Sequence, residues 1–497
     1  MLFNSYEYLL AFLPLALILF HGLRRLKLQR LPIAAAVLLS LAFYAWWEPL
    51  NLLLLVPLIG INFELARRIA PRRGRPARFG KPLLALGITL DLATLAWFKY
   101  ANFGVDTFNA LAGTHVELAR IVLPIGISFF VFQMIASLVD AWRGHMEHFN
   151  LLDYALFITF FPQLVAGPIV HHGEMLPQFH HYRGVTASTV ALGVTILAIG
   201  LAKKVLLADS VAGYASARFD AAAAGQPLAP VDAWAGALAY TAQLYFDFSG
   251  YSDMAIGAGL LFGIRLPVNF ASPYKAESII DFWRRWHMTL SRFLRDYLYV
   301  PLGGGRRGPV RRHVNLLLTM LLGGLWHGAG WTFVAWGAMH GLFLVANHAW
   351  RALAGRHGID LSRHAPGRWA AWAVTFLAVV VAWVFFRAAD LPTAGRVVAA
   401  MAGLVGMAGA GAAAHFGDNI EALLVAAALL ALARLAPNTQ ELAGYAGPGE
   451  APPAADAPLA RALRWRPSPV WAVATGAGLA VALMSLSRVS EFLYFQF

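Results

Sequence analysis

Residues 369–386 read WAAWAVTFLAVVVAWVFF, without a single charged side chain. A helix needs about 20 mainly apolar residues to cross a bilayer, so this stretch predicts a transmembrane span. Similar stretches occur at residues 9–19, 31–47, 52–65 and 470–486. Only 13% of the 497 residues are charged, against about 25% in soluble domains. The sequence therefore predicts an all-α, polytopic integral membrane protein.

The basic residues lie in short loops beside these apolar stretches. The net charge is +13, which in a soluble protein would point first to nucleic acid. Here the clusters 24–30, 67–81 and 306–312 fit cytoplasmic loops, whereas 47–51 and 101–117 contain no Lys or Arg and fit the outer side. We predict an outside N-terminus, contact with membrane lipids and no nucleic-acid partner.

The chain contains no cysteine. Disulfides, thiolate metal sites and a cysteine-bound acyl intermediate on this chain are therefore excluded. His171 and His172 are adjacent, but no further ligands at short spacing accompany them, so we predict no metal site.

Prolines and polar residues interrupt the middle third of the chain, residues 123–350. Irregular backbone at membrane depth is tolerated only where protein or a water-filled cavity surrounds it. We therefore expect short, tilted or re-entrant helices around an interior cavity.

A segment rich in Trp, His and Gly, GGLWHGAGWTFVAWGAMHG, occupies residues 323–341. If the preceding residues are helical, His327 lies roughly 20 Å from the cytoplasmic surface. An ionisable residue at such depth suggests function, and glycines permit a ligand to approach closely. The alternative is a buried neutral histidine bonded to a carbonyl, with the glycines serving helix packing. For His340 and His348 the packing interpretation is favoured.

Residues 281–301, DFWRRWHMTLSRFLRDYLYVP, predict one amphipathic helix near the cytoplasmic face. Arg284 and Arg285 are candidate ligands for phosphates, of lipids or of an anionic donor such as coenzyme A. His287 falls on the apolar face among tryptophans. It is interpreted either as a site residue or as a core histidine whose hydrogen bonds are satisfied.

Two carboxylates, Asp247 and Asp253, occur within the span-like segment QLYFDFSGYSD at 243–253. Such groups must line a cavity, orient a histidine or pair with arginines, and a structural ion pair is the commoner use. Asp247 and Asn269 join Arg284, Arg285 and Trp326 as candidate substrate-binding residues.

Several long motifs resemble the membrane-bound O-acyltransferase superfamily, in particular the bacterial branch of alginate O-acetylation membrane subunits. The similar stretches are LPIGISFFVFQ (123–133), FFPQLVAGPI (160–169), YFDFSGYSDMAIG (245–257), NFASPY (269–274), FWRRWHMTLSRFLRDYLYVPLGGGR (282–306), the segment at 323–341 and the ending FLYFQF. The resemblance runs from about Phe3 to the C-terminus and is weakest between Arg351 and Arg466.

The resemblance implies a single domain over residues 1–497 in the bacterial inner membrane, with a ring of helices around a thin central pore. It divides into N-terminal spans (1–122), a catalytic core (123–350) and C-terminal spans (351–497) with a loose loop near 436–469. The family's invariant histidine falls on His327, and a second polar position, Asn or His, falls on His287. Members of this branch relay acetyl groups to a periplasmic polysaccharide O-acetyltransferase subunit, so we expect acetyl-CoA or another acyl thioester as donor and no bound cofactor.

Transfer of an acyl group from a thioester needs a base or relay nucleophile, commonly His, and donors for the developing oxyanion. We expect His327 to accept the acyl group or to deprotonate its acceptor. The oxyanion donors would come from His287, the Trp326 indole or backbone N–H groups near Gly328. A transporter or channel would explain a pore but not the Trp/His/Gly segment. A non-catalytic scaffold of a polysaccharide export complex is the remaining alternative.

Overall fold

The computed structural model describes residues 1–26, 30–71, 79–146, 150–165, 167–182, 184–404, 416–453, 458–486 and 493. Within these ranges every regular element is helical, which confirms the predicted all-α class. Most of the basic cluster at 67–81 and of the C-terminal FLYFQF lies outside the described residues.

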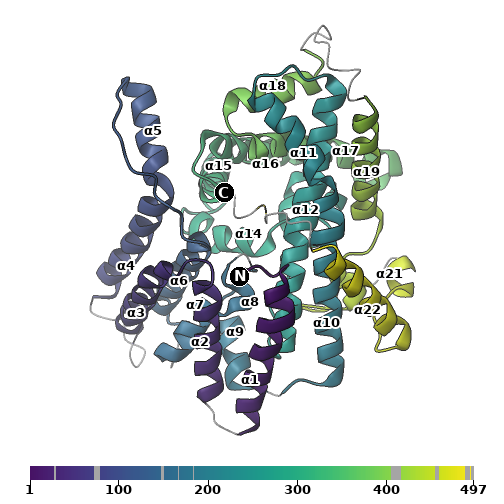
Figure 1. Cartoon of the computed structure of the whole chain (residues 1–497). Helices are drawn as coiled ribbons and strands as arrows, with labels where there is room; N and C mark the ends of the chain where they lie inside the picture. Colours follow the sequence, from purple (N-terminus) through teal and green to yellow (C-terminus); the bar gives the residue numbers. More distant parts are fainter. Residues whose placement is uncertain are drawn as a thin grey trace.

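The N-terminal third consists of apolar helices and short π or 3-10 turns (Figure 1). They are η1 (Glu7–Phe12), α1 (Leu13–Arg25), α2 (Leu31–Ala45), η2 (Pro49–Asn51), α3 (Leu52–Ile69), α4 (Gly80–Leu95), η3 (Ala96–Tyr100) and α5 (Ala101–Ala112). Pro32 stands in the first turn of α2, where a missing N–H costs nothing. Gly113 ends α5 at φ +65°, a left-handed conformation that glycine adopts readily.

The middle third contains short helices and extended segments, as predicted from its prolines. Its elements are α6 (Ile127–Trp142), α7 (Leu151–Thr159), α8 (Phe161–Leu164), α9 (His172–His180), α10 (Ala187–Ala202), η4 (Lys203–Ala208), α11 (Asp209–Ala223), α12 (Pro230–Leu261), η5 (Pro273–Lys275), α13 (Ile279–Arg285), α14 (Met288–Leu294), η6 (Arg295–Tyr299), α15 (Gly308–His327) and α16 (Trp331–Arg356). The 32-residue α12 is buried along most of its length and packs on α10, α11 and α19.

The α10–α12 contact depends on glycine. A Cβ added to Gly250 would lie 2.7 Å from the carbonyl oxygen of Gly200, and one added to Gly257 would lie 2.7 Å from that of Gly193. Small residues allow helix backbones to approach closely inside a membrane. The glycines of the 245–257 motif therefore fix the central helix against its neighbour.

The C-terminal third comprises η7 (Leu361–Arg363), α17 (Ala365–Arg387), α18 (Leu391–Met401), α19 (Phe416–Leu435), α20 (Thr439–Ala443), α21 (Pro458–Ala462) and α22 (Pro469–Met484). The segment 436–469, expected as a loose loop, is packed over its first part. Thr439 and Gln440 donate hydrogen bonds to the carboxylate of Asp253, at 2.6 and 2.8 Å, and the Tyr445 hydroxyl donates to the Leu266 carbonyl at 2.6 Å. The expectation was wrong there because a buried carboxylate requires partners.

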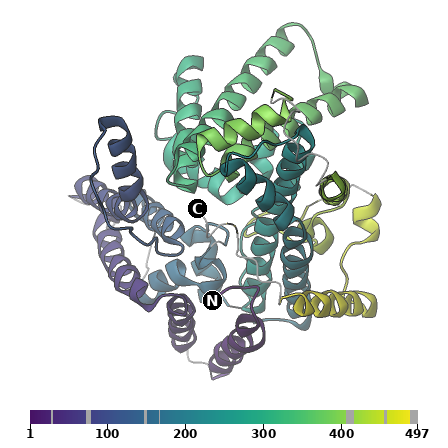
Figure 2. The same cartoon turned by 45° about the horizontal axis from the view of Figure 1, so that its top comes forward.

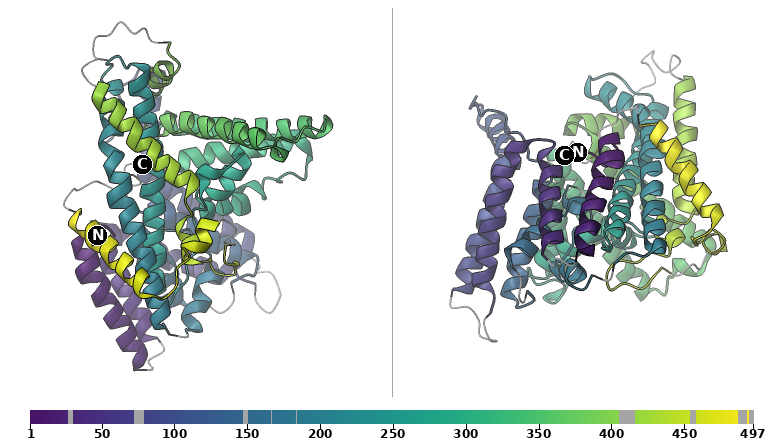
Figure 3. Two further views of the ribbon diagram at one scale, coloured as in Figure 1. Left: turned by 90° about the vertical axis from the view of Figure 1, so that its right-hand side faces the viewer. Right: turned by 60° about the horizontal axis from the view of Figure 1, so that its bottom comes forward.

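Five helical segments in the described ranges are long and apolar enough to cross a membrane: Glu7–Arg25, Pro49–Ile69, Gly80–Ala112, Ala187–Ala223 and Ala365–Arg387. The right-hand view of Figure 3 shows the long helices, from the purple α1 and α2 to the teal α10, running roughly parallel. This arrangement confirms a polytopic membrane protein.

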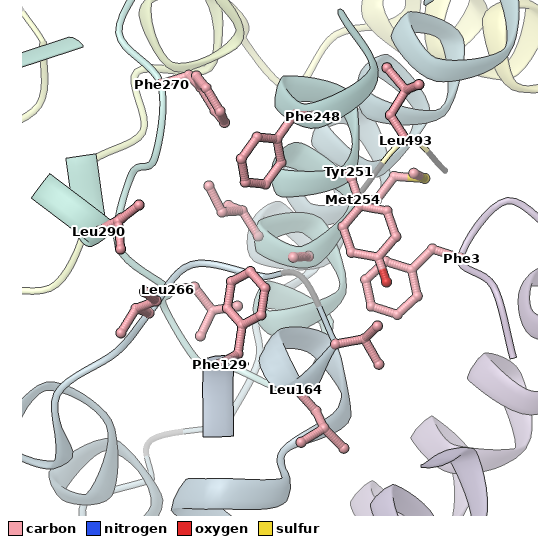
Figure 4. Packing of buried hydrophobic residues seen from close by; sticks show 14 of the residues in the cluster. Phe3, Phe129, Leu164, Phe248, Tyr251, Met254, Leu266, Phe270, Leu290 and Leu493 are labelled. Carbon is pink, nitrogen blue, oxygen red and sulfur yellow. The ribbon is translucent and has the colours of Figure 1, made fainter. Parts of the chain in front are cut away.

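The helices surround a central region of the protein, which side chains fill. In Figure 2 the N-terminal helices, the α15–α16 pair and α10–α12 lie on different sides of this middle region. Figure 4 shows Phe129 of α6, Leu164 of α8 and Phe248 and Tyr251 of α12 facing it, with Phe3 beside Tyr251. The Phe3 and Tyr251 rings stack with centroids 4.6 Å apart. The central pore stays a prediction.

Candidate active site

The α15–α16 hairpin holds His327 as the last residue of α15, and α16 begins only four residues later, at Trp331. A Cβ added to Gly324 would lie 2.3 Å from the Phe333 carbonyl oxygen, and one added to Gly337 would lie 2.4 Å from that of Met320. These two glycines therefore serve helix packing, one of the two interpretations that the sequence left open.

An aromatic shell surrounds His327, which is only 5% exposed. Its ring centroid lies 4.9 Å from that of Trp326, 5.1 Å from Trp336 and 5.2 Å from Phe386. The His287 ring, from a different part of the chain, is 6.2 Å away. The structure thus brings the two predicted catalytic histidines together in a buried, largely apolar environment.

His287 interrupts the helix expected over residues 281–301, so the prediction of one helix was wrong. α13 ends at Arg285, α14 begins at Met288, and His287 has φ +43°. The break arises because the chain pairs with an extended segment: Ala271 N–H donates to the Arg285 carbonyl at 2.9 Å, and Met288 N–H to the Asn269 carbonyl at 2.9 Å. These contacts hold His287 in the interior, at 0% exposure.

Asn269 fixes the His287 ring. The Asn269 side-chain oxygen lies 3.0 Å from His287 Nδ1 and also accepts a 2.9 Å hydrogen bond from the Thr289 hydroxyl. An amide oxygen only accepts, so Nδ1 carries the proton of the neutral imidazole and Nε2 presents a lone pair. Predicted as a substrate ligand, Asn269 contacts a catalytic candidate instead.

The Trp326 indole N–H donates to the Ser128 carbonyl of α6 at 3.3 Å. The indole stacks on Phe132 with centroids 5.3 Å apart. This hydrogen bond already uses the donor that we expected for the oxyanion. The neighbouring Trp336 has a buried indole N–H with no hydrogen-bond partner in the described part of the chain.

A cavity of about 590 Å³ lies between the α13–α14 segment and the α15–α16 pair. Its lining includes Arg284, Arg292, Arg295, Trp283, Thr289, Met320 and His348. Of the two predicted arginine ligands, only Arg284 lines it. Arg285 donates from Nε to both oxygens of Asp281 at 2.9 Å and from a terminal nitrogen to the Ala271 carbonyl at 3.3 Å, which gives it a structural position.

Asp247 lies apart from the histidines, in a buried ion pair. Its carboxylate is 2.8 Å from Lys204 Nζ and accepts a 3.1 Å bond from the Leu493 N–H. Asp253 pairs in the same way with Lys203 at 2.7 Å. The partners are lysines of η4 rather than the arginines that the sequence suggested.

Sequence reasoning missed Lys99, and for His340 it favoured a packing role. Lys99 Nζ donates to the backbone carbonyls of Trp326 and His327, the residues at the end of α15. The signal was present, because Lys99 interrupts an apolar stretch at membrane depth. His340 is fully buried, and its Nδ1 accepts a 3.2 Å bond from the Trp283 indole, a residue of the cavity wall.

In the ranges that the structure describes, no group of three or more His, Cys, Asp or Glu side chains is placed to hold an ion. The rings of Trp326, Trp336, Phe386 and His287 lie beside His327, an environment suited to acid–base or nucleophilic chemistry.

This fold and this site define a class of protein: a helical membrane protein with two buried histidines and a cavity lined by arginines. The family model of the membrane-bound O-acyltransferases matches residues 83–386, and the chain belongs to that family. It is 42% identical to the peptidoglycan O-acetyltransferase of Helicobacter pylori, over 82% of this chain and 81% of that protein. It is also 46% identical to the probable alginate O-acetylase AlgI of Azotobacter vinelandii (81% of this chain, 78% of that protein) and 44% identical to that of Pseudomonas aeruginosa (81% and 75%).

The protein is therefore a multi-pass membrane acyltransferase. This assignment favours the enzyme over the transporter, channel and scaffold alternatives. The matched residues 83–386 contain both histidines, Lys99 and all the cavity-lining residues except Glu450.

Proposed function

We propose that this chain relays acetyl groups from a cytoplasmic thioester donor across the bacterial inner membrane, for O-acetylation of an exported polysaccharide. The observation that carries the proposal is the His327–His287 pair, with ring centroids 6.2 Å apart inside a buried aromatic shell. Relatives named for the O-acetylation of peptidoglycan and of alginate, at 42–46% identity, support the acetyl group and the polymer class.

The donor would enter through the arginine-lined cavity. Arg292 is already engaged by Glu174, at 2.5 and 2.9 Å, whereas Arg284 has no ion-pair partner in the described part of the chain. A guanidinium there would bind the phosphates of coenzyme A or of another phosphorylated thioester carrier. Thr289 of the cavity wall bonds the same Asn269 oxygen as His287, so hydrogen bonds connect the cavity wall to His287 through Asn269.

In this proposal His327 either attacks the thioester carbonyl, so that the C–S bond breaks and the thiol carrier leaves, or deprotonates the acceptor hydroxyl, which attacks that carbonyl with the same leaving group. His287, held with its proton on Nδ1, accepts a proton at Nε2 rather than donating to the oxyanion. The Trp336 indole N–H replaces Trp326 as the oxyanion donor, because its ring lies 5.1 Å from that of His327.

The acceptor side would require a partner. The described helices form one membrane body, and a glycan needs a binding surface outside the bilayer. We therefore assign the final ester transfer to a periplasmic polysaccharide O-acetyltransferase subunit, with this chain supplying the acyl group through the predicted pore.

Substitution His327→Ala tests the proposal. We expect loss of polymer acetylation with expression and insertion near normal, because the end of α15 is held through backbone carbonyls that alanine retains. The measurement is the acetyl-ester content of the polymer, normalised to the amount of the chain in membranes. Full acetylation per molecule of His327→Ala would disprove the catalytic assignment.

A nucleophilic His327 leaves a trace that a general base does not. An acyl-imidazole is cleaved by neutral hydroxylamine, so membranes exposed to labelled acetyl donor would carry hydroxylamine-labile label on the wild-type chain and none on His327→Ala. Absence of label from an active wild type would assign His327 as the base.

A further inference from the structure

The helix that carries His327 is held at its end by two side chains from the N-terminal third. Lys99 Nζ donates to the Trp326 carbonyl at 2.5 Å, to the His327 carbonyl at 3.1 Å and to the Ser128 hydroxyl at 3.2 Å. The Tyr100 hydroxyl donates to the Leu325 carbonyl at 2.7 Å. Three consecutive carbonyls at the end of α15 thus receive donors from η3.

The last carbonyls of a helix have no partner within the helix and carry a partial negative charge. Inside a membrane such groups must be satisfied by protein. The turn after α15 supplies only one weak bond, from Gly328 N–H to the Gly324 carbonyl at 3.3 Å. Lys99 and Tyr100 therefore supply the bonds that water would supply at a helix end in solution.

Lys99 has no capacity left for substrate. An ammonium group has three donors, and all three are used by the oxygens of Trp326, His327 and Ser128. The Lys99 ammonium lies at the carbonyl end of α15, which carries a partial negative charge.

We infer that Lys99 and Tyr100 are positioning residues, which fix the end of α15 and thereby the place of the His327 ring relative to His287. The inference rests on the proposed role of His327. Displacement of a reacting group by about 1 Å costs on the order of 100-fold in rate. The activity should therefore depend on two residues that do not touch the substrate.

The first experiment compares Lys99→Met with Lys81→Met, a control on the exposed beginning of α4. We expect Lys99→Met to lower the rate of polymer acetylation per molecule about 100-fold, with the KM for labelled acetyl-CoA in inverted membrane vesicles within about twofold. Lys81→Met should leave both quantities unchanged. Full activity in Lys99→Met at normal abundance would overturn the inference.

A second readout needs no activity. Hydrogen exchange measured on peptides covering residues 322–330 should rise in Lys99→Met, because the end of α15 loses its bonds, while peptides from α10 and α12 stay unchanged. An increase spread evenly over the whole chain would indicate a general loss of structure and contradict a local positioning role.

Chemical rescue exploits the absence of native cysteine. Lys99→Cys provides a single thiol beside a cavity of about 80 Å³ that Lys99, Ser128 and Trp326 line. Alkylation with 2-bromoethylamine forms a thioether and releases bromide, which restores an ammonium at nearly the lysine position. We expect at least tenfold recovery of activity in proportion to the modified fraction, measured by intact mass.

Iodoacetamide, which adds an uncharged amide to the same thiol, is the control reagent and should restore nothing. Equal recovery with both reagents, or none after complete aminoethylation, would overturn the role of the charge.

Tyr100→Phe tests the inference independently, and Tyr6→Phe is its control. Tyr6 also donates to a backbone carbonyl, that of Leu483 at 2.8 Å, but lies on another helix. We expect a two- to tenfold loss in Tyr100→Phe and none in Tyr6→Phe. Equal losses in the two variants would contradict the inference.

Failure of the proposed function can be distinguished from failure of the inference about Lys99 and Tyr100. Full activity of His327→Ala would remove the reason to position that ring. Exchange at residues 322–330 would still decide whether Lys99 holds α15.

Discussion

At the scale of single residues, the site combines one histidine at a helix end with another at a break between helices. Both rings are buried, and side chains contact each of them: Asn269 contacts His287, and the aromatic rings of Trp326, Trp336 and Phe386 surround His327. A fixed orientation is the property that general acid–base or nucleophilic catalysis requires of a histidine.

Trp336→Phe tests the oxyanion donor that we propose in place of Trp326. Phenylalanine keeps an aromatic ring beside His327 but lacks the indole N–H and the second ring of the indole, so abundance and thermal unfolding of the variant are measured with its activity. Loss of one oxyanion donor typically costs about 10²–10³-fold in kcat. We expect a fall of that size in polymer acetylation per molecule, with normal abundance; Trp369→Phe, an exposed tryptophan of α17, is the control. An unaffected rate would remove Trp336 from the mechanism.

A double-mutant comparison tests whether Asn269 acts through His287. His287→Ala should reduce acetylation about 10²–10⁴-fold, the usual contribution of a positioned acid–base group. Asn269→Ala should lose less alone and add nothing to His287→Ala, because residues that act as a unit are not additive. Losses that multiply in the double variant would show that Asn269 acts separately.

At the scale of elements, the break between α13 and α14 decides where His287 lies. Left-handed backbone costs a non-glycine residue roughly 1–2 kcal/mol, and asparagine tolerates it better than alanine does. The bonds of the Asn269 and Ala271 backbone to Met288 and Arg285 offset that strain. The site therefore depends on the contact between residues 269–271 and the break as much as on the histidine itself.

The left-handed backbone at His287 predicts how substitutions there rank in unfolding temperature and in activity. His287→Asn keeps a polar side chain suited to φ +43°, so it should unfold at a higher temperature than His287→Ala and retain more acetylation. His287→Gly should match the stability of His287→Asn but lack its activity. Thermal unfolding in detergent and acetyl-ester content provide the two measurements. Equal unfolding temperatures for the three variants would show that the left-handed backbone carries no strain.

The sequence allowed part of the site to be predicted, for identifiable reasons. His327 and His287 stood out because ionisable side chains were embedded in Trp-rich and Gly-rich apolar segments. The break at His287 was not predictable from helical periodicity, since its cause is pairing with residues 269–271. Lys99 was overlooked because its acceptors lie at the end of α15, more than 200 residues away. Asp247 and Arg285, predicted as substrate ligands, are bonded within the protein: Asp247 to Lys204 and the Leu493 N–H, and Arg285 to Asp281 and the Ala271 carbonyl.

At the scale of the whole molecule, the fold follows from apolar spans that the composition already revealed. Each of the spans predicted at residues 9–19, 31–47, 52–65, 369–386 and 470–486 contains a helix in the structure. The arrangement of these helices around the α12 core depended instead on glycine contacts and buried ion pairs. Such long-range pairings leave no periodic signal in the sequence.

The orientation can be tested on two exposed positions, His115 and Arg307. In cells that express His115→Cys, a membrane-impermeant maleimide should label the introduced thiol from outside. In cells that express Arg307→Cys, the same reagent should label the thiol only after the inner membrane is opened. The cysteine-free native chain provides a background without signal. Labelling of the Arg307→Cys variant in intact cells would reverse the predicted topology.

The adjacent Lys203 and Lys204 have a consequence for how the chain enters the membrane. They stand inside the apolar segment Ala187–Ala223, where each lysine costs about 2.5–3.5 kcal/mol on insertion. Asp209 follows Lys204 closely, but Asp247 and Asp253 leave the ribosome about 40–50 residues later. Protein synthesis adds about 5–20 residues per second, so α12 emerges several seconds after the two lysines. We expect the translocation machinery to retain α10 until α12 arrives and to release the two helices into lipid as a pair.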